Sequence, residues 1–414
     1  MSSDTTNIQP RLLSSFPVSL EANPVPPSAA VMADELELRI SRMRGRMSDA
    51  ELDVIVLTDP KNVEYFTGYR SLHPVQKTRP VMAVLTHEHA IIIGSLSTVK
   101  FIEDLPAHIS AVAYAGYLAE AIIAVDNHIS AMPNAERKHV AIDYGQDMLG
   151  YGSLELVDRL KSLSSDQSVS SASDVLWRVR MIKTPFEARM KSTGFAIVNR
   201  AFDQTIANAY AGISEIELYR MLQAQIFLNG AESSDSIPML FSDGDFSYSR
   251  WPSARKLREG HYIWTDFSAT YGGYPTDRNR TARCGEPSAW EINTYTRVRS
   301  LTVELARSFK PGLRCRDVYS HFQRLWKEAA LGDTYGLVSR IGHGGGLDIL
   351  EPPSISATDE TIIEAGMVFH VEPKLEKNGA VFQFEEILFV QDDGIEFLSE
   401  LSPEQIPIVD PAVR

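Results

Sequence analysis

The chain has 414 residues, of which 44% are hydrophobic and 23% are charged, and its formal net charge is −14. This length exceeds what one ordinary hydrophobic core supports and predicts two domains. The acidic balance disfavours nucleic acid as a partner, because like charges repel the phosphate backbone. No run of 18 apolar residues is present, so we expect no membrane span and no membrane partner.

Only two cysteines, Cys284 and Cys315, are present, which is too few for a disulfide framework or a cysteine zinc site. Such low cysteine usage is typical of a reducing compartment. The first ten residues, MSSDTTNIQP, lack the basic and apolar regions of a signal peptide. We therefore expect a cytoplasmic protein.

Residues 1–33 are rich in Ser, Pro, Asn and Thr, and this composition predicts an N-terminal arm or tail. One helix is predicted directly after this arm, where apolar residues recur between Leu36 and Met47, and another around 154–163. Short apolar runs bounded by turn residues predict strands at 53–60, 81–94 and 139–145. Alternating strands and helices predict an α/β N-terminal domain over residues 34–182. The run His87-Glu88-His89 has metal-like spacing, but its place between two apolar strands favours an exposed hairpin tip.

The character of the sequence changes near residue 183. Thr184 and Glu187 form a capping-box pattern around Pro185, which predicts a long helix that ends near residue 210. Ser214 with Glu217 and Ser288 with Glu291 repeat this pattern and predict helices from Ser214 and over 288–309. A fourth helix is predicted over 316–330, and strand-like segments at 261–283 and 367–391. The second domain, residues 183–414, is therefore expected to be α+β, with long helices that cover an antiparallel sheet.

Two aspartates in the segment 261–283 stand out. Gly272-Gly273 separates two β-prone runs and predicts a two-residue hairpin. In that register Asp266 faces Asn279, and Asp277 lies diagonally on the same face. The sequence thus predicts two carboxylates within reach of one metal ion, since such a pair is costly to bury without a cation.

The spacing between a glycine and the acid that follows it occurs twice in this domain. REGHYIWTD and EAGMVFHVE each place an acid six residues after a glycine, and these acids are Asp266 and Glu372. The apolar run 381–390 contains Glu385-Glu386, of which only one can face the site. His343 lies beside glycines that allow close approach of the backbone. Four carboxylates and one imidazole suit a pair of Mn²⁺, Zn²⁺, Co²⁺ or Fe²⁺ ions, with the ligands Asp266, Asp277, His343, Glu372 and Glu385.

These residues resemble the ligands of the pita-bread metallopeptidases, the family of aminopeptidase P, prolidase, methionine aminopeptidase and creatinase. The matching motifs are Asp266, Asp277 with Arg280-Thr281, Gly342-His343-Gly344, Glu372-Pro373 and Glu385. The segments 59–71 and 179–191 resemble the creatinase-type N-terminal domain and its junction. The resemblance implies a creatinase-like N-terminal domain, a pita-bread catalytic domain and a homodimer. It also selects Glu385 as the late ligand and Glu372 as the carboxylate that accepts or shuttles the proton of water.

The chain also departs from the family pattern. Ser249 and Leu350 stand where peptidases of this family usually have histidines, and both changes remove proton donors that support peptide cleavage. His370 lies two residues before Glu372, so both side chains share a face of the strand. Its predicted role is an extra ligand, a general base or a partner of a carboxylate; a histidine packed in the core is the structural alternative.

Several residues are candidates for substrate binding. Arg280 has the shape to hold a substrate carboxylate, or alternatively a structural ion pair with a ligand acid. A Trp beside an Arg can hold a cationic or planar group, although a packed loop aromatic is the simpler interpretation of Trp251. In dimers of this type the loop after the Thr-Gly-Tyr turn reaches the partner's active site. The resemblance therefore adds Tyr69, Arg70 and His73 to Ser249, Trp251 and Arg280.

The main hypothesis is a metal-dependent hydrolase that uses a metal-bridged hydroxide on an amide or other C–N bond. Its expected substrate is a small molecule or an Xaa-Pro-type dipeptide, with Glu372 and His370 as catalytic residues. The alternatives are a metal-dependent lyase acting on a small osmolyte, a creatinase-like small-molecule hydrolase, and a non-catalytic binding module.

Overall fold

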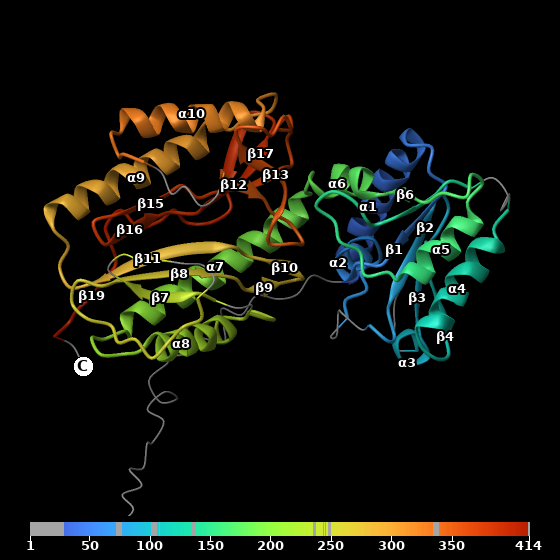
Figure 1. Cartoon of the computed structure of the whole chain (residues 1–414), viewed down its shortest axis with the longest axis horizontal. Coiled ribbons are helices and arrows are strands. Elements are labelled where there is room, and N and C mark those ends of the chain that lie inside the picture. Colours follow the sequence, from blue (N-terminus) through green and yellow to red (C-terminus); the bar gives the residue numbers. More distant parts are fainter. Residues whose placement is uncertain are drawn as a thin grey trace, which may run out of the picture.

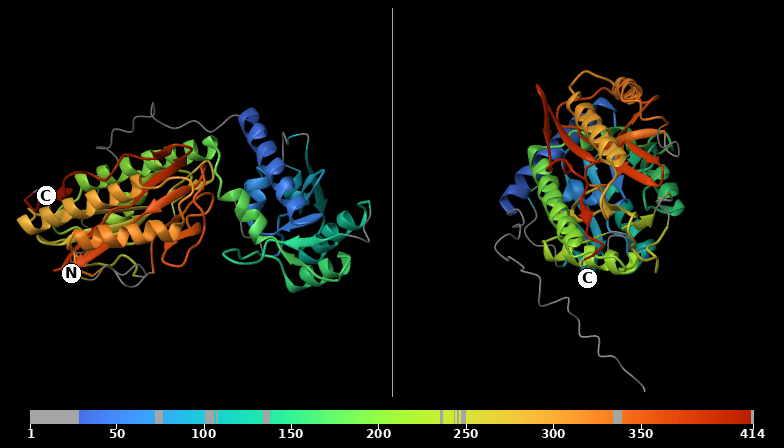
Figure 2. Two further views of the ribbon diagram at one scale, coloured as in Figure 1. Left: turned by 90° about the horizontal axis from the view of Figure 1, so that it is seen from above. Right: turned by 90° about the vertical axis from the view of Figure 1, so that its left-hand side faces the viewer.

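The computed structural model describes residues 29–412, apart from 72–76, 101–105, 107, 134–137, 235–236, 243, 245, 247–249 and 334–338. Two domains lie end to end along the long axis of the molecule (Figures 1 and 2). Within the described residues, no helix combines the length and the apolar character needed to cross a bilayer. Most of the predicted N-terminal arm, residues 1–28, lies outside the described part of the chain.

The N-terminal domain is built on one mixed sheet with the strand order β4-β3-β2-β1-β5-β6. Strand β1 lies inside this sheet, where it pairs antiparallel with β2 and parallel with β5. The strands predicted for this domain are all present. The bounds are β1 (Val54–Leu57), β2 (Met82–Thr86), β3 (Ala90–Ser95), β4 (Ile109–Tyr114), β5 (Val140–Ile142) and β6 (Ser170–Ser171). The turn between β2 and β3 exposes His87, Glu88 and His89, as predicted for a hairpin tip.

Helices cover both faces of this sheet. Along β1, Val54 and Val56 join one core, whereas Ile55 and Leu57 join the other, because successive side chains point to opposite faces. Helix α1 begins at Ala29, so residues 29–33 are helical and not part of an extended arm; alanines at its start favour the helix. The helices are α1 (Ala29–Asp49), α2 (Pro60–Thr67), α3 (Leu96–Val99), α4 (Leu118–Ser130), α5 (Leu154–Leu163) and α6 (Ser173–Arg180).

The C-terminal domain contains two larger antiparallel-rich sheets, with the strand orders β19-β11-β8-β7 and β13-β12-β14-β17-β18. Two hairpins, β9-β10 and β15-β16, extend from them. The first sheet and its hairpin contain β7 (Met239–Ser242), β8 (Tyr262–Phe267), β9 (Thr270–Tyr271), β10 (Tyr274–Pro275), β11 (Arg278–Cys284) and β19 (Ile408–Val409). The second set contains β12 (Arg340–Gly344), β13 (Glu351–Ser356), β14 (Val368–Val371), β15 (Lys374–Lys377), β16 (Ala380–Gln383), β17 (Glu386–Gln391) and β18 (Gly394–Phe397).

Two pairs of long helices enclose these sheets (Figure 1). They are α7 (Pro185–Ala207) with α8 (Glu215–Leu228), and α9 (Ala289–Arg307) with α10 (Cys315–Glu328). The predicted capping boxes at Thr184, Ser214 and Ser288 are present. Helices α7 and α9 end two to three residues earlier than predicted, because the amides of Asn208 and Ser308 bond three residues back and tighten the last turn.

Ion pairs of the buried Arg180 join the two domains. The Arg180 guanidinium, at the end of α6, donates to Asp348 and to Glu351 at 2.6 Å each. Lys183 donates to the other oxygen of Glu351 at 2.8 Å. Burial alone would raise the pKa of Glu351, but the two cations outweigh it and lower that pKa to about 2. The loop that follows His343 is therefore attached to the N-terminal domain.

Candidate metal centre

The hairpin between β8 and β11 positions the two aspartates as predicted. Tyr271 pairs with Tyr274, and Asp266 on β8 faces Asn279 on β11. Asp277 lies immediately before β11, and its carboxylate is close enough to Asp266 for a hydrogen bond if one of the two is protonated. The two carboxylates therefore share one face of the first sheet.

The second sheet supplies the other members in the same way. His343 on β12 lies directly opposite His370 on β14, and Glu372 follows the end of β14. The repeated glycines, Gly260 and Gly366, adopt left-handed φ angles of +88° and +91° in the turns that precede β8 and β14. The repeated sequence thus corresponds to a repeated turn and strand, each ending in an acid of the site.

His343 connects the acids from the two halves. Its Nε2 atom lies 3.4 Å from Oδ2 of Asp277 and 3.5 Å from Oε1 of Glu372. Its Nδ1 atom lies 2.8 Å from the carbonyl oxygen of Gly344. We assign the ring proton to Nδ1, because a carbonyl can only accept, and this leaves the Nε2 lone pair directed at the two carboxylates.

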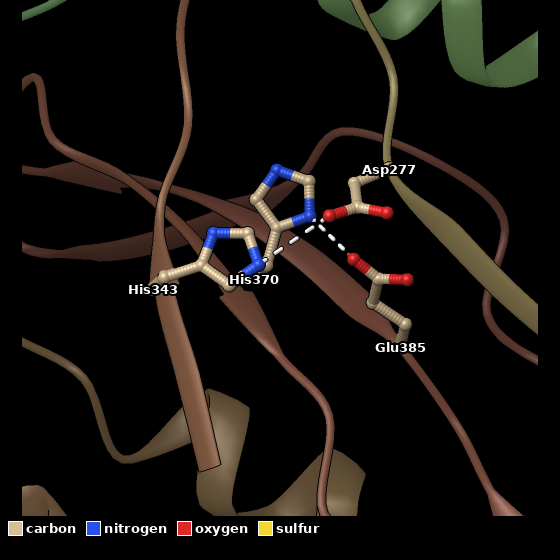
Figure 3. Close-up of side chains that lie close together, drawn as sticks. All are labelled: Asp277, His343, His370 and Glu385. Carbon is tan, nitrogen blue, oxygen red and sulfur yellow. Dashed lines mark hydrogen bonds and ion pairs between the residues drawn. The ribbon is translucent and has the colours of Figure 1, made fainter. Parts of the chain in front are cut away.

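Glu385 and His370 form the innermost part of the centre (Figure 3). Nδ1 of His370 lies 2.7 Å from Oε1 of Glu385, and the backbone amide of Asn279 donates to Oε2 of Glu385 at 2.5 Å. The rings of His343 and His370 stack with centroids 4.8 Å apart. His370 and Glu385 are fully buried.

The two adjacent glutamates separate as strand geometry requires. Glu385 enters the centre, whereas Glu386 turns away and accepts hydrogen bonds from the amide and hydroxyl of Ser402. The guanidinium of Arg278 lies 3.8 Å from Oε2 of Glu386. Of the pair, the structure places only Glu385 beside the other candidate ligands.

The electrostatics of the centre fit a cation. Burial raises the pKa of Asp266 and of Glu385 well above the usual range, and the neighbouring carboxylates raise both further. Burial, together with Asp277, also raises the pKa of Glu372 despite the opposing effect of His343. Oδ1 of Asp266 is buried without a hydrogen-bond partner among the described residues. Divalent cations would neutralise this repulsion and use the unpaired oxygen.

The centre retains access to solvent. The side chains of Asp277 and Glu372 keep 18% and 17% of their surface exposed, whereas that of His343 keeps 2%. Solvent therefore reaches Asp277 and Glu372, while the imidazoles form the enclosed side.

The predicted substrate-binding residues do not all lie at this centre. Arg280 is buried, and its guanidinium donates to the carbonyl oxygens of Asn279 and Glu385. Its described bonds are thus structural. Trp251 is 68% exposed. Ser249 and His73 lie outside the described residues.

The N-terminal loop residues contact their own chain. Arg70 pairs with Glu232 of the C-terminal domain at 2.6 Å and approaches Glu64 at 3.6 Å. Tyr69 is half-buried against the core beneath α1 and α2. The Arg70–Glu232 pair therefore links this part of the N-terminal domain to the C-terminal domain.

Two residues that support the centre were not predicted from the sequence. The side-chain nitrogen of Gln383 donates to Oε2 of Glu372 at 3.2 Å, and its side-chain oxygen accepts a hydrogen bond from the indole nitrogen of Trp264. Its position two residues before Glu385 was the available signal, since alternate residues share a face. Lys191, fully buried on α7, donates to the carbonyls of Pro275 and Gly346 at 2.9 and 3.4 Å. It thereby links the segment before Asp277 to the glycine loop, and no local pattern indicates this.

Comparisons with known proteins agree with this architecture. The sequence model of metallopeptidase family M24 matches residues 192–392, and that of the creatinase/prolidase N-terminal domain matches residues 39–182. An uncharacterized peptidase of Staphylococcus aureus (strain USA300) is 26% identical over 366 residues, which are 87% of this chain and 98% of the relative.

Solved structures share the same fold. An Xaa-Pro dipeptidase from Bacillus anthracis superposes with a TM-score of 0.77 at 24% identity, over 90% of this chain and 99% of that one. The prolidase from Pyrococcus furiosus gives 0.73 at 21% identity, over 87% and 100%. An X-Pro aminopeptidase from Thermotoga maritima gives 0.74 at 22% identity, over 89% and 99%.

The fold is thus a creatinase-type N-terminal domain followed by a pita-bread domain, as expected. The chain belongs to metallopeptidase family M24.

Proposed function

We propose that this protein hydrolyses an amide or related C–N bond in an Xaa-Pro-type dipeptide or a small molecule, with two divalent metal ions as cofactors. The observation that carries the proposal is the convergence of four carboxylates and His343 on one buried, partly open centre. The structural neighbours include an Xaa-Pro dipeptidase and a prolidase, which supports the dipeptide class.

The proposed ligands divide between the two halves of the domain. Asp266 and Asp277 come from the first sheet, and His343, Glu372 and Glu385 come from the strands and connections of the second set. Bound divalent ions would supply a water molecule of lowered pKa and would polarise the scissile carbonyl.

Glu372 is the proposed proton acceptor. Gln383 holds one of its oxygens at 3.2 Å, which fixes the carboxylate, and the side chain is open enough for water to reach it. General-base catalysis requires a basic atom within hydrogen-bond reach of the proton it removes. Glu372 meets the requirements of position and access.

The proposed substrate is small. The reason is that a proton donor that supports peptide cleavage is missing: Leu350, at the position where related peptidases have a histidine, is 52% exposed and offers no such donor.

The segment that contains Trp251 is fixed by its neighbours. Both terminal nitrogens of Arg250 and the backbone amide of Ser253 donate to the carboxylate of Glu215, each at 2.8 Å. We propose that Trp251 borders the substrate entrance.

Metal analysis of the wild type and of Asp277→Ala tests this function. We expect about two transition-metal ions per wild-type chain, by analogy with dimetal hydrolases, and loss of metal in the variant. Asp393→Ala is the control, because Asp393 is an exposed carboxylate remote from the centre. A folded wild type that holds no metal after incubation with Mn²⁺, Zn²⁺ or Fe²⁺ would contradict the proposal.

A substrate screen identifies the bond that is broken. Xaa-Pro dipeptides and small amides should be hydrolysed by the metal-loaded wild type and not by Asp277→Ala. In H₂¹⁸O, hydrolysis places ¹⁸O in the product, whereas a lyase leaves the product unlabelled. Unlabelled product would replace the hydrolase proposal with elimination chemistry.

We also propose a cytoplasmic homodimer, on the family resemblance and the low cysteine usage. Light scattering after gel filtration should give twice the chain mass of 46.1 kDa. If the protein is a monomer, no loop of a partner chain can contribute to substrate binding.

A further inference from the structure

His370 occupies a position that a merely packed histidine does not need. Its ring is fully buried between the rings of His343, at 4.8 Å, and Phe195, at 5.9 Å. Gly345 makes room for it, because a Cβ atom there would lie 2.6 Å from Nε2 of His370. The fold thus accommodates an imidazole at this site on the enclosed side of the centre.

The orientation of the ring directs Nδ1 to the carboxylates. Nδ1 is 2.7 Å from Oε1 of Glu385. One ligand atom from each of four side chains lies within 4.8 Å of all the others (Figure 3). Ligands at about 2.0–2.2 Å from one ion are at most about 4.4 Å apart, so small adjustments suffice for a shared ion. The four residues are Asp277, His343, His370 and Glu385.

We propose that Nδ1 of His370 is an additional ligand, so that one metal position is bound by two imidazoles and two carboxylates. The proposal rests on the dimetal centre proposed above, whose expected ligand set contains one imidazole. With Nδ1 as the ligand, the ring proton resides on Nε2. A second nitrogen ligand shifts the preference of the position away from Mn²⁺ and toward Zn²⁺, Co²⁺ or Fe²⁺.

The competing role for His370 is purely positional. In that case Nδ1 carries the proton and donates to Glu385, which holds the carboxylate for the metal. The two roles differ in one substitution. In His370→Asn, the amide nitrogen stands near the position of Nδ1 and can still donate to Glu385, but the variant has no imidazole to bind metal.

X-ray absorption spectroscopy of the Zn²⁺-loaded enzyme distinguishes these roles, because imidazole ligands give a characteristic scattering pattern. We expect two imidazoles per chain in the wild type and one in His370→Asn. We also expect the affinity for Zn²⁺ to fall by about 10-fold or more in the variant, since removing even a hydrogen-bond partner of a metal ligand costs this much. His89→Asn is the matched control, since His89 is exposed at the β2-β3 turn.

The outcomes separate the two proposals. A wild type with two zinc ions but one imidazole per chain would overturn this inference and leave the proposed hydrolase intact. So would an unchanged imidazole count in His370→Asn. A wild type that binds no metal would contradict the proposed function itself. The wild-type count decides the question even if the variant does not fold.

Discussion

Gln383 shows how a single uncharged side chain can support the reaction. It donates to Glu372 and accepts from the indole of Trp264, so its orientation is fixed at both ends. We predict that Gln383→Leu weakens metal binding and lowers activity by about 10- to 100-fold, the usual cost of losing a partner of a metal ligand. Competition with a chromogenic chelator would measure the affinity.

The control for this substitution is Gln391→Leu. Gln391 is exposed at the end of β17 and donates to Glu396 on the surface. Its replacement should leave metal affinity unchanged. Equal affinities of the Gln383→Leu variant and the wild type would show that Glu372 needs no support from Gln383.

Residue-level features were predictable where local geometry determines them. The two-glycine hairpin sets the register that places Asp266 opposite Asn279. Strand alternation requires that only one of Glu385 and Glu386 faces the site, although the resemblance was needed to choose between them. The hydrogen bonds of Arg280 were not predictable, because a guanidinium can pair with either carboxylates or carbonyls.

At the scale of elements, the turns before β8 and β14 provide a matched pair. Gly260 and Gly366 have nearly equal left-handed φ angles, but only one of them is crowded. A Cβ atom on Gly366 would lie 2.8 Å from a methyl carbon of Ile182 and 3.0 Å from the carbonyl oxygen of Lys183, whereas one on Gly260 meets nothing within 4 Å.

We therefore predict unequal effects of the two alanine substitutions. Gly260→Ala should cost about 1 kcal/mol, the penalty for a left-handed L-residue. Gly366→Ala should cost about 2–4 kcal/mol, because overpacking adds to that penalty. Thermal unfolding of both variants measures the difference. Equal melting temperatures would indicate that the domain junction adjusts freely around Gly366.

Helices α7, α8 and α9 were predicted from their capping signals, but the long-range pairing of strands was not. Thr184, Ser214 and Ser288 determine where helices begin through bonds within four residues. By contrast, β12 reaches β14 across more than twenty residues, and this pairing brings His343 beside Glu372. Such pairings depend on the packing of the whole sheet, which local periodicity does not encode.

At the scale of the whole molecule, stability should depend on pH through Glu351. Its pKa in the folded protein is about 2, below the ordinary value of 4.5. Because this pKa is lower in the folded than in the unfolded protein, ionised Glu351 makes its full contribution to the free energy of unfolding at pH values above 4.5. This contribution is lost as the pH falls toward 2. We predict that Glu351→Gln lowers the melting temperature at pH 7 by removing a buried charge, at a cost of about 3–5 kcal/mol. In this variant Lys183 loses its carboxylate partner, and Arg180 keeps only the partly exposed Asp348.

The deficit of Glu351→Gln should shrink between pH 4.5 and pH 3, because the carboxyl takes up a proton in the unfolded wild type there, which lowers the free energy of the unfolded state while the folded state keeps its charge. Asp158→Asn is the control, since Asp158 pairs with Lys161 on the surface and such a pair contributes about 0.5 kcal/mol. A deficit that stays constant from pH 7 to pH 3 would contradict the assigned role of the Glu351 charge.

The Arg180–Glu351–Lys183 contact also limits how the protein can be engineered. A chain cut between the two domains would leave Glu351 without Arg180, and Asp348 without its cation, directly beside the glycine loop. The catalytic half is therefore not an interchangeable module. A chimera with the N-terminal half of a relative would need an arginine at the position of Arg180, so the two halves are expected to have been inherited, and exchanged, together.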